Sequence, residues 1–429
     1  MPTHTPARED SHMDFRITDI EVVTVDVPFT EVAGPNMRRA MLAWSVSEIV
    51  RVKTNLGLVG VGETIVNYTW SRGSDEKKRE AIGRNPYELL YRDDLGAGVQ
   101  IAIWDLAAQY AGVPVHALLG EKVRDSAPIA WWCIDMPPAD WADEARRAVA
   151  AGYTTFKLKG RPWFDIVEQV EAVVAAAGSD VLIDVDFNDF LLDADNALEV
   201  CGALEQIPNV AIFETPIPQG DIDGNKRLRA ELKSEIAHHM GSPPVPVAAR
   251  EGVCDGFVLC AGADRITRQA HAAQELEMPF WIQLVGTGIT TAWASHLGVA
   301  LQNATWPAIT CMNIYADQMV TPSLDVNDGH IEVGDDVGLG IHLDEDALER
   351  FRVQPPVEAE HPRWIHTVTF ADGQTAHYRN ADAYRQDFKA RGMPVGHRDV
   401  RLETWHDDGS EAFADMLTRV EDGPVREAN

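Results

Sequence analysis

The sequence has no long apolar run, few cysteines and a shortage of basic residues. No uninterrupted apolar stretch approaches the roughly 20 residues that span a bilayer, so we expect no membrane segment. The opening segment, MPTHTPAREDSHM, is polar and has no apolar core of a secretory signal. We expect residues 1–15 to form a disordered tail.

Acidic residues outnumber basic ones by 67 to 37, which gives a formal net charge of -30 at pH 7. A field of this sign repels phosphate backbones and anionic lipid surfaces, so nucleic acid and membranes are not expected partners. It also repels an acidic small molecule at long range. A site for such a substrate therefore needs locally concentrated cations, either a metal ion or paired lysines.

Cysteine is scarce and odd in number. The five cysteines lie in or beside apolar stretches and lack the close spacing of zinc sites: Cys133, Cys201, Cys254, Cys260 and Cys311. We therefore expect reduced thiols in a cytoplasmic protein.

The length of 429 residues, of which 45% are apolar, exceeds what one compact core usually holds. The first part has an α+β pattern, with strands expected over residues 17–27 and 47–52, a TNLG turn into GLVGVGET, and a helix over 98–110. The glycines of GLVGVGET do not indicate a phosphate loop, because no Lys-Ser/Thr follows them. We assign residues 16–127 to an α+β capping domain.

From residue 128 onward, short apolar strands alternate with amphipathic helices, which predicts parallel βαβ units. The strand candidates are IAWWC, TTFKLK, VLIDV, VAIFE, EIAHH, DGFVL, PFWIQL and PAITC. Eight strands predict an α/β fold, a modified (β/α)8 TIM barrel over residues 128–319, with residues 320–353 completing the cap. Residues 354–429 form a hairpin-rich extension around an Asp372-Gly373 turn, which we expect to serve oligomer contacts.

Charged residues stand at successive predicted strand ends, where this barrel places its chemistry. Lys157 and Lys159 alternate with Leu158, so their ammonium groups share one side of the strand and lower each other's pKa. Asp186 and Glu214 end the next two strands and can share a hard divalent cation. The alternatives are solvated lysines and carboxylates that cap the following helices.

These segments resemble the mandelate racemase and muconate lactonizing branch of the enolase superfamily, over roughly residues 16–350. The resemblance is carried by GLVGVGET, AIWDLAAQYAGVPVHALLG, GYTTFKLKGRPW, DFN, ETPIP and GLGIHLDEDALERF. It implies that Lys159 abstracts a proton, that Lys157 is its partner, and that Asp186 and Glu214 are the first two magnesium ligands.

The sequence departs from that family at two places. The third, normally acidic, metal ligand corresponds to His238 or His239 in EIAHHMG, with His239 the better match by position. Imidazole suits zinc, iron or manganese better than magnesium, so Mg²⁺, Mn²⁺ or another divalent metal remains open, as does a hydrogen-bonded wall histidine. The Asp-His dyad of many racemases corresponds to Cys260 and Gln283, and glutamine cannot transfer a proton.

The resemblance implies abstraction of the proton α to the carboxylate of a small-molecule substrate, through an enediolate stabilised by the metal. Dehydration of a hydroxy acid or sugar acid is the leading hypothesis, with Lys159 or His238 as the general acid. A racemase, epimerase or cycloisomerase is the second hypothesis. A catalytically idle barrel with a binding or structural role is the third.

Substrate contacts are expected from the barrel mouth and from cap loops over residues 29–43 and 66–72. The candidates are Asn188, Gln283, Arg161, Trp132 and Tyr68. The aromatic pair could equally pack the cap on the barrel, Gln283 could be a structural amide, and Arg161 could pair with a surface acid. We expect a homo-oligomer.

Overall fold

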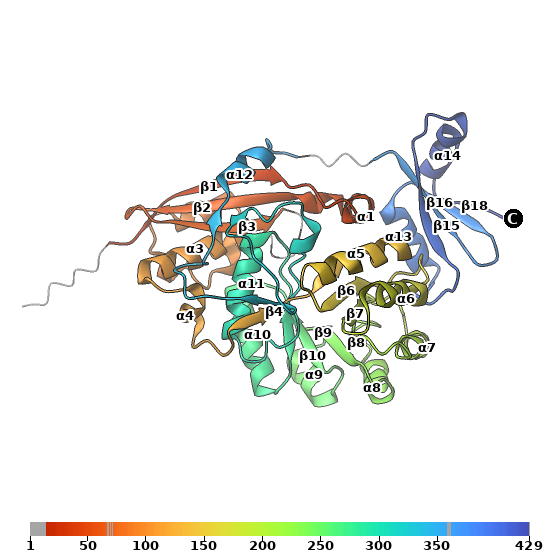
Figure 1. Cartoon of the computed structure of the whole chain (residues 1–429), viewed down its shortest axis with the longest axis horizontal. Helices are drawn as coiled ribbons and strands as arrows, with labels where there is room; N and C mark the ends of the chain where they lie inside the picture. The colour runs from red at the N-terminus through yellow and green to blue at the C-terminus, as the bar shows by residue number, and fades with distance from the viewer. Residues whose placement is uncertain (1–13, 67, 69, 71, 358–361, 429) are drawn as a thin grey trace, which may run out of the picture.

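The computed structural model describes residues 14–66, 68, 70, 72–357 and 362–428. Figure 1 shows three parts: the cap sheet in red and orange, the barrel in yellow to cyan, and a carboxy-terminal domain in blue beside α5 and α6. Of the tail predicted over residues 1–15, residues 1–13 lie outside the described residues. Phe15, assigned to that tail, is instead buried and stacks on Tyr110 with ring centroids 4.2 Å apart.

The cap is an antiparallel sheet in the order β1-β2-β3, as the strand pattern predicted, packed on helix α3. The glycines of GLVGVGET allow this packing, because a Cβ at Gly62 would lie 1.9 Å from the carbonyl oxygen of Gly98. The cap elements are β1 (Ile17–Asp26), α1 (Ala33–Ala40), η1 (Leu42–Ser45), β2 (Val46–Thr54), β3 (Val59–Ile65), α2 (Asp75–Ala81), η2 (Pro86–Glu88), η3 (Asp93–Leu95), α3 (Ala97–Ala111) and α4 (Val115–Leu119).

The barrel sheet is parallel. Among the described residues, its strands lie in the order β11-β10-β9-β8-β7-β6-β5. Its strands are β5 (Trp131–Cys133), β6 (Thr155–Lys159), β7 (Leu182–Asp186), β8 (Val210–Glu214), β9 (Glu235–His239), β10 (Gly256–Leu259) and β11 (Phe280–Ile282). Its helices are α5 (Pro138–Ala150), α6 (Ile166–Ala177), α7 (Ala194–Leu204), α8 (Ile222–Glu231), α9 (Val245–Glu251), α10 (Ala263–Glu275) and α11 (Gly288–Ala300).

The eighth predicted strand, PAITC, closes the barrel as a two-residue contact. Ala308 bridges Ile129 and Ile309 bridges Gln283, both in parallel, and the amide of Ile309 donates to the carbonyl of Ile282 at 2.8 Å. The modified TIM barrel with an α+β cap is thereby confirmed. No helix among the described residues is long and apolar enough to cross a bilayer.

Two carboxylates of the cap hold the amino ends of barrel helices. Glu63 accepts from the amides of Thr287 and Thr290 and from the Thr290 hydroxyl, at 2.9–3.2 Å, and so caps α11. Asp93 accepts from the amide of Asp264 at 3.0 Å at the start of α10. Because these helices follow strands, their amino ends lie at the carboxyl edge of the sheet. The cap therefore sits over the edge where TIM barrels carry chemistry.

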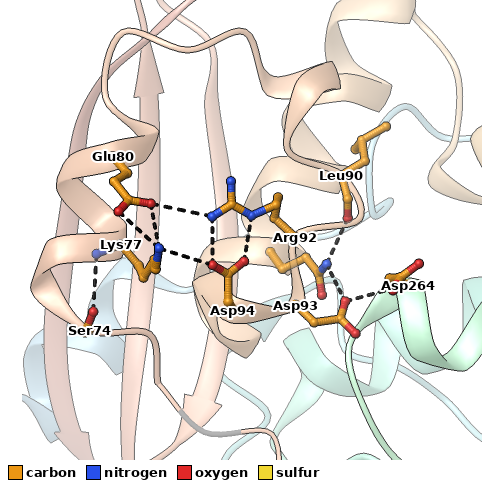
Figure 2. A network of polar contacts seen from close by, with 9 residues as sticks. Ser74, Lys77, Glu80, Leu90, Arg92, Asp93, Asp94 and Asp264 are labelled. Atoms are coloured by element: carbon orange, nitrogen blue, oxygen red, sulfur yellow. Dashed lines mark hydrogen bonds and ion pairs between the residues drawn. The ribbon is translucent and has the colours of Figure 1, made fainter.

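Figure 2 shows the second of these contacts from close by. Asp93 links Asp264 to the side chain of Gln100 on α3, whose amide nitrogen lies 2.9 Å from Asp93 Oδ1. Beside it, Arg92 and Asp94 form a two-bond pair with both distances at 2.7 Å. This exposed pair lies beside the capping contact.

After the barrel, the chain returns to the cap and then builds a further domain. The returning elements are η4 (Met312–Ile314), β12 (Val320–Thr321), β13 (His330–Glu332), which pairs with β4 (Ser126–Pro128), β14 (His342–Leu343) and α12 (Glu345–Phe351). The further domain contains β15 (Trp364–Thr369), β16 (Thr375–Tyr378), α13 (Ala381–Ala390), β17 (Arg401–His406), α14 (Glu411–Glu421) and β18 (Val425–Glu427). The predicted hairpin is β15–β16, within an antiparallel sheet ordered β17-β15-β16-β18.

Candidate active site

The barrel register places the predicted strand-end residues on one inward face. Lys159 pairs with Asp186 across β6 and β7, and Asp186 pairs with Glu214 across β7 and β8. Residues paired in parallel strands share a face, so these three side chains converge at the carboxyl edge. Lys159 forms an ion pair with Asp186, and its side chain remains 14% exposed at the mouth.

Lys157 lies one step deeper and is buried with its partner. Its Nζ is 2.6 Å from Glu214 Oε2, with the two side chains 1% and 0% exposed. The same ammonium lies 4.0 Å from the centroid of the Trp281 ring. Burial opposes ionisation of Glu214, but the charges of Lys157, His239 and Lys159 outweigh it and hold the pKa of Glu214 well below its ordinary value.

Asp184 is a buried carboxyl of this interior that the sequence analysis did not single out. It pairs with Lys157 in the strand register, one layer below Asp186. Burial raises the pKa of Asp184 to about 7, with Glu214 raising it further and Lys157 opposing the rise. The signal was present, because Asp184 and Asp186 alternate in the strand as Lys157 and Lys159 do.

The two histidines of β9 point in opposite directions. His239 faces inward, with Nε2 2.9 Å from Glu214 Oε1 and Nδ1 3.7 Å from Cys260 Sγ. Burial disfavours its charged form, but the contacts with Cys260 and Glu214 raise the pKa of His239 to about 10. His238 faces outward, with Nε2 3.0 Å from Asn225 Oδ1 on α8, and burial lowers its pKa to about 4. His238 therefore does not reach the site, and the general-acid role predicted for it is wrong.

The donors at this edge suit a divalent cation. Both carboxylate oxygens of Glu214 are buried and, although an ammonium and an imidazole lie beside them, neither has a hydrogen bond of good geometry. Asp186 stands next to Glu214 in register, so two hard oxygen donors adjoin. Within the described ranges, no three His, Cys, Asp or Glu side chains are grouped closely enough to hold a metal ion. His239 becomes a third donor only if its Nε2 releases Glu214.

Arg161 and Asn188 bind the loops at the carboxyl edge of the sheet. The Arg161 guanidinium donates to the carbonyls of Gly160 and Asp186, at 2.7 and 3.2 Å, and to Asn188 Oδ1 at 2.6 Å. The amide of Asn188 donates to Asp186 Oδ1 at 2.8 Å, and its own φ is +45°. Arg161 is buried rather than paired with a surface acid, and its guanidinium binds loop oxygens, so the substrate contact predicted for it does not fit its contacts.

The cap supplies an aromatic wall above the barrel mouth. The amide nitrogen of Gln283, at the end of β11, donates to the hydroxyl of Tyr68 at 3.0 Å. Trp44 packs against both predicted aromatics, 4.6 Å from the ring centroid of Tyr68 and 5.6 Å from that of Trp132. The structure therefore brings Tyr68, Gln283 and Trp132 to one side of the mouth and adds Trp44, which no sequence signal distinguished from a core tryptophan.

Comparisons with known proteins agree with this geometry. Residues 140–347 match the family described as Enolase C-terminal domain-like. N-succinyl-L-Arg/Lys racemase of Bacillus cereus is 23% identical over 336 residues, which cover 72% of this chain and 90% of that protein. D-gluconate dehydratase of Thermoproteus tenax is 25% identical over 370 residues, covering 75% of this chain and 73% of that protein.

Solved structures give the same result for the fold. The muconate lactonizing enzyme from Pseudomonas fluorescens, complexed with muconolactone, matches with a TM-score of 0.65 and 24% identity, covering 79% of this chain and 100% of that one. The matches extend over both cap and barrel. This chain is a member of the enolase superfamily, in its mandelate racemase and muconate lactonizing branch.

Proposed function

We propose that this protein is a hydro-lyase that removes the proton α to the carboxylate of a hydroxy acid or sugar acid and expels the β-hydroxyl. The observation that carries the proposal is the placement of Lys159, partly exposed at the barrel mouth, beside the adjacent carboxylates of Asp186 and Glu214. A base next to a cation site is the arrangement that enediolate chemistry requires. The similarity to D-gluconate dehydratase supports a sugar acid as substrate.

Asp186 and Glu214 would hold a divalent cation, Mg²⁺ or Mn²⁺, with His239 as third donor once it leaves Glu214. When bound, such a cation supplies positive charge that polarises the substrate carboxylate and stabilises the enediolate. Release of Asp186 by Lys159 would accompany this binding, and it would leave the lysine free to meet the substrate.

The remaining roles belong to side chains of the protein itself. Lys159 takes the α-proton and, as an ammonium, can return it to the departing hydroxyl on the same face, since His238 faces away from the site. Lys157 keeps Glu214 ionised in a buried setting. Tyr68 and Trp44 cover the mouth and limit access of water to the enediolate.

Proton NMR in deuterium oxide tests the proposal directly, with magnesium or manganese and a library of hydroxy acids and sugar acids. We expect loss of the α-proton signal together with formation of a 2-keto-3-deoxy acid. Lys159→Met should abolish this turnover. Lys53→Met, which removes a cap-surface lysine paired with Glu21, should not affect it.

Isomerisation is the second candidate, because the racemase of Bacillus cereus and the muconate lactonizing enzyme are among the similar proteins. It predicts α-proton exchange with an inverted or rearranged product and no loss of water. Turnover that survives Lys159→Met would contradict both reactions, because each uses Lys159 as the base.

A further inference from the structure

The carboxy-terminal domain, residues 364–427, docks beside the catalytic edge of the barrel. In Figure 1 this domain stands next to α5 and α6, the helices that follow β5 and β6. It contacts two consecutive strand-to-helix loops directly, residues 160–165 and 187–193, and reaches the loop before them, residues 134–137, through Arg39 of the cap. Such loops carry the chemistry of TIM barrels, so we propose that this domain is a fixed wall of the active site, with Arg398 and Tyr384 as positioning residues for Lys159 and Asp186.

The first contact shares one carboxylate between the barrel and the domain. Asp165 Oδ1 caps helix α6, and Asp165 Oδ2 accepts from Arg398 Nε at 2.8 Å and from the amide of Asp399 at 3.0 Å. The amide of Asp165 donates to the carbonyl of Val400 at 3.1 Å. Asp165 stands six positions after Lys159 at the far end of one short loop. Its position therefore constrains the strand end that carries the base.

The second contact joins cap, barrel and carboxy-terminal domain at a buried ion pair. Arg39 on α1 lies 2.9 Å from Asp135 Oδ2, in the loop after β5, and donates to the hydroxyl of Tyr384 at 2.5 Å. Trp163, in the loop after β6, donates to Asp135 Oδ2 at 2.8 Å and packs 4.6 Å from the Tyr384 ring. One hydroxyl from the domain thus completes a network that spans two catalytic loops.

The third contact holds the loop after β7. The amide of Val395 donates to the carbonyl of Phe190 at 2.9 Å, and the Lys389 ammonium lies 5.0 Å from the Phe190 ring. The same loop contains Asn188, whose backbone amide binds Asp186. The loops that follow Lys159 and Asp186 are therefore tied directly to residues beyond the part of the chain matched by the family, and the loop after β5 is tied to them through Arg39.

Hydrogen–deuterium exchange on the full-length protein tests this role without any substrate. The double variant Tyr384→Phe/Arg398→Met should raise exchange about 10-fold in peptides covering residues 160–165 and 187–193, and should leave β15 and β17 unchanged. The matched control is Arg401→Met, in the same domain, whose arginine is exposed and pairs only loosely with Glu403 at 3.7 Å. Single variants Tyr384→Phe and Arg398→Met provide the measurement should the double variant fail to fold.

A kinetic measurement separates positioning from stability, and this part rests on the proposed function. We expect the double variant to lower kcat roughly 10-fold while KM stays within about twofold, because misplaced reacting groups cost rate more than binding. Arg398→Lys should recover part of the loss seen in Arg398→Met. Unchanged exchange in both loops would overturn the proposal whatever the substrate, whereas failure to find turnover bears on the proposed function alone. Increased exchange confined to the carboxy-terminal domain would overturn it too.

Discussion

Replacing Lys157 by methionine tests the electrostatic core of the site. The Lys157 ammonium is buried, 2.6 Å from Glu214, and shares its face of β6 with Asp184 in the neighbouring strand. Methionine fills a similar volume but removes the charge. Glu214 then keeps His239 and the more distant Lys159 and Arg161 as counter-charges.

The expected cost follows from the burial of both partners. Removing one member of a buried ion pair costs about 3–5 kcal/mol, because the remaining charge is left uncompensated. For a chain of 429 residues, this corresponds to a melting temperature lower by roughly 3–6 °C. The pKa of Glu214 is depressed in the folded protein, so the stability from this pair is present above its ordinary value of 4.5 and is lost as the pH falls further. The difference in melting temperature between the variant and the parent should therefore become smaller below that pH.

Thermal unfolding at pH 7 measures the effect, with Lys226→Met as the control. Lys226 forms an exposed pair with Glu251 at 3.1 Å, which should be worth less than about 1 kcal/mol. The double variant Lys157→Met/Glu214→Gln should recover much of the loss, because it removes both charges. A Lys157→Met protein that melts within about 1 °C of the parent would refute the reasoning, since an uncompensated buried carboxylate must then cost almost nothing.

Three further predictions follow from named contacts. Glu63→Ala should cost about 1–3 kcal/mol by leaving the amino end of α11 without its acceptor, while Glu76→Ala on the exposed face of α2 should be neutral in the same melt. Saturating Mg²⁺ or Mn²⁺ added to chelator-treated protein should raise the melting temperature, because a ligand at one hundred times its Kd adds about 2.7 kcal/mol to the free energy of unfolding. Asp186→Asn should remove that rise. Burial lowers the pKa of His366 to about 3, so the unfolded chain takes up a proton near pH 6.5 while the folded chain does not. The carboxy-terminal domain should thus lose about 2 kcal/mol between pH 7 and pH 5, and His366→Gln should flatten that loss in a pH series of melts.

The sequence was sufficient for the fold because the barrel's pattern is local. Short apolar strands such as VLIDV and VAIFE alternate with amphipathic helices, and the structure places β7 and β8 there. The cap hairpin and the helix around Gly98 are likewise local signals. Lys159, Asp186 and Glu214 could be predicted to meet, because parallel strands bring their carboxyl ends to one edge.

The rest depends on contacts that no local pattern shows. His238 and His239 differ by one position in β9, and that single step decides which faces the site and which packs on α8. Two of the bonds of Arg161 go to main-chain carbonyls, which carry no side-chain signature. The contact between Arg398 and Asp165 joins residues far apart in the sequence, so the carboxy-terminal domain could be predicted as a hairpin but not placed.

The side-chain charges at the barrel mouth show why the two lysines alone do not attract an acidic substrate. Lys157, Lys159 and a protonated His239 stand against Asp186 and Glu214, with Asp184 near half-ionisation at neutral pH because its pKa is about 7. These charges nearly cancel, inside a protein whose formal net charge is -30. An acidic substrate approaching such a site meets repulsion at long range and little attraction at contact. A divalent cation on Asp186 and Glu214 would add two positive charges at this nearly neutral site. Cation binding should therefore precede substrate binding, and substrate affinity without the cation should be weak for reasons of charge alone.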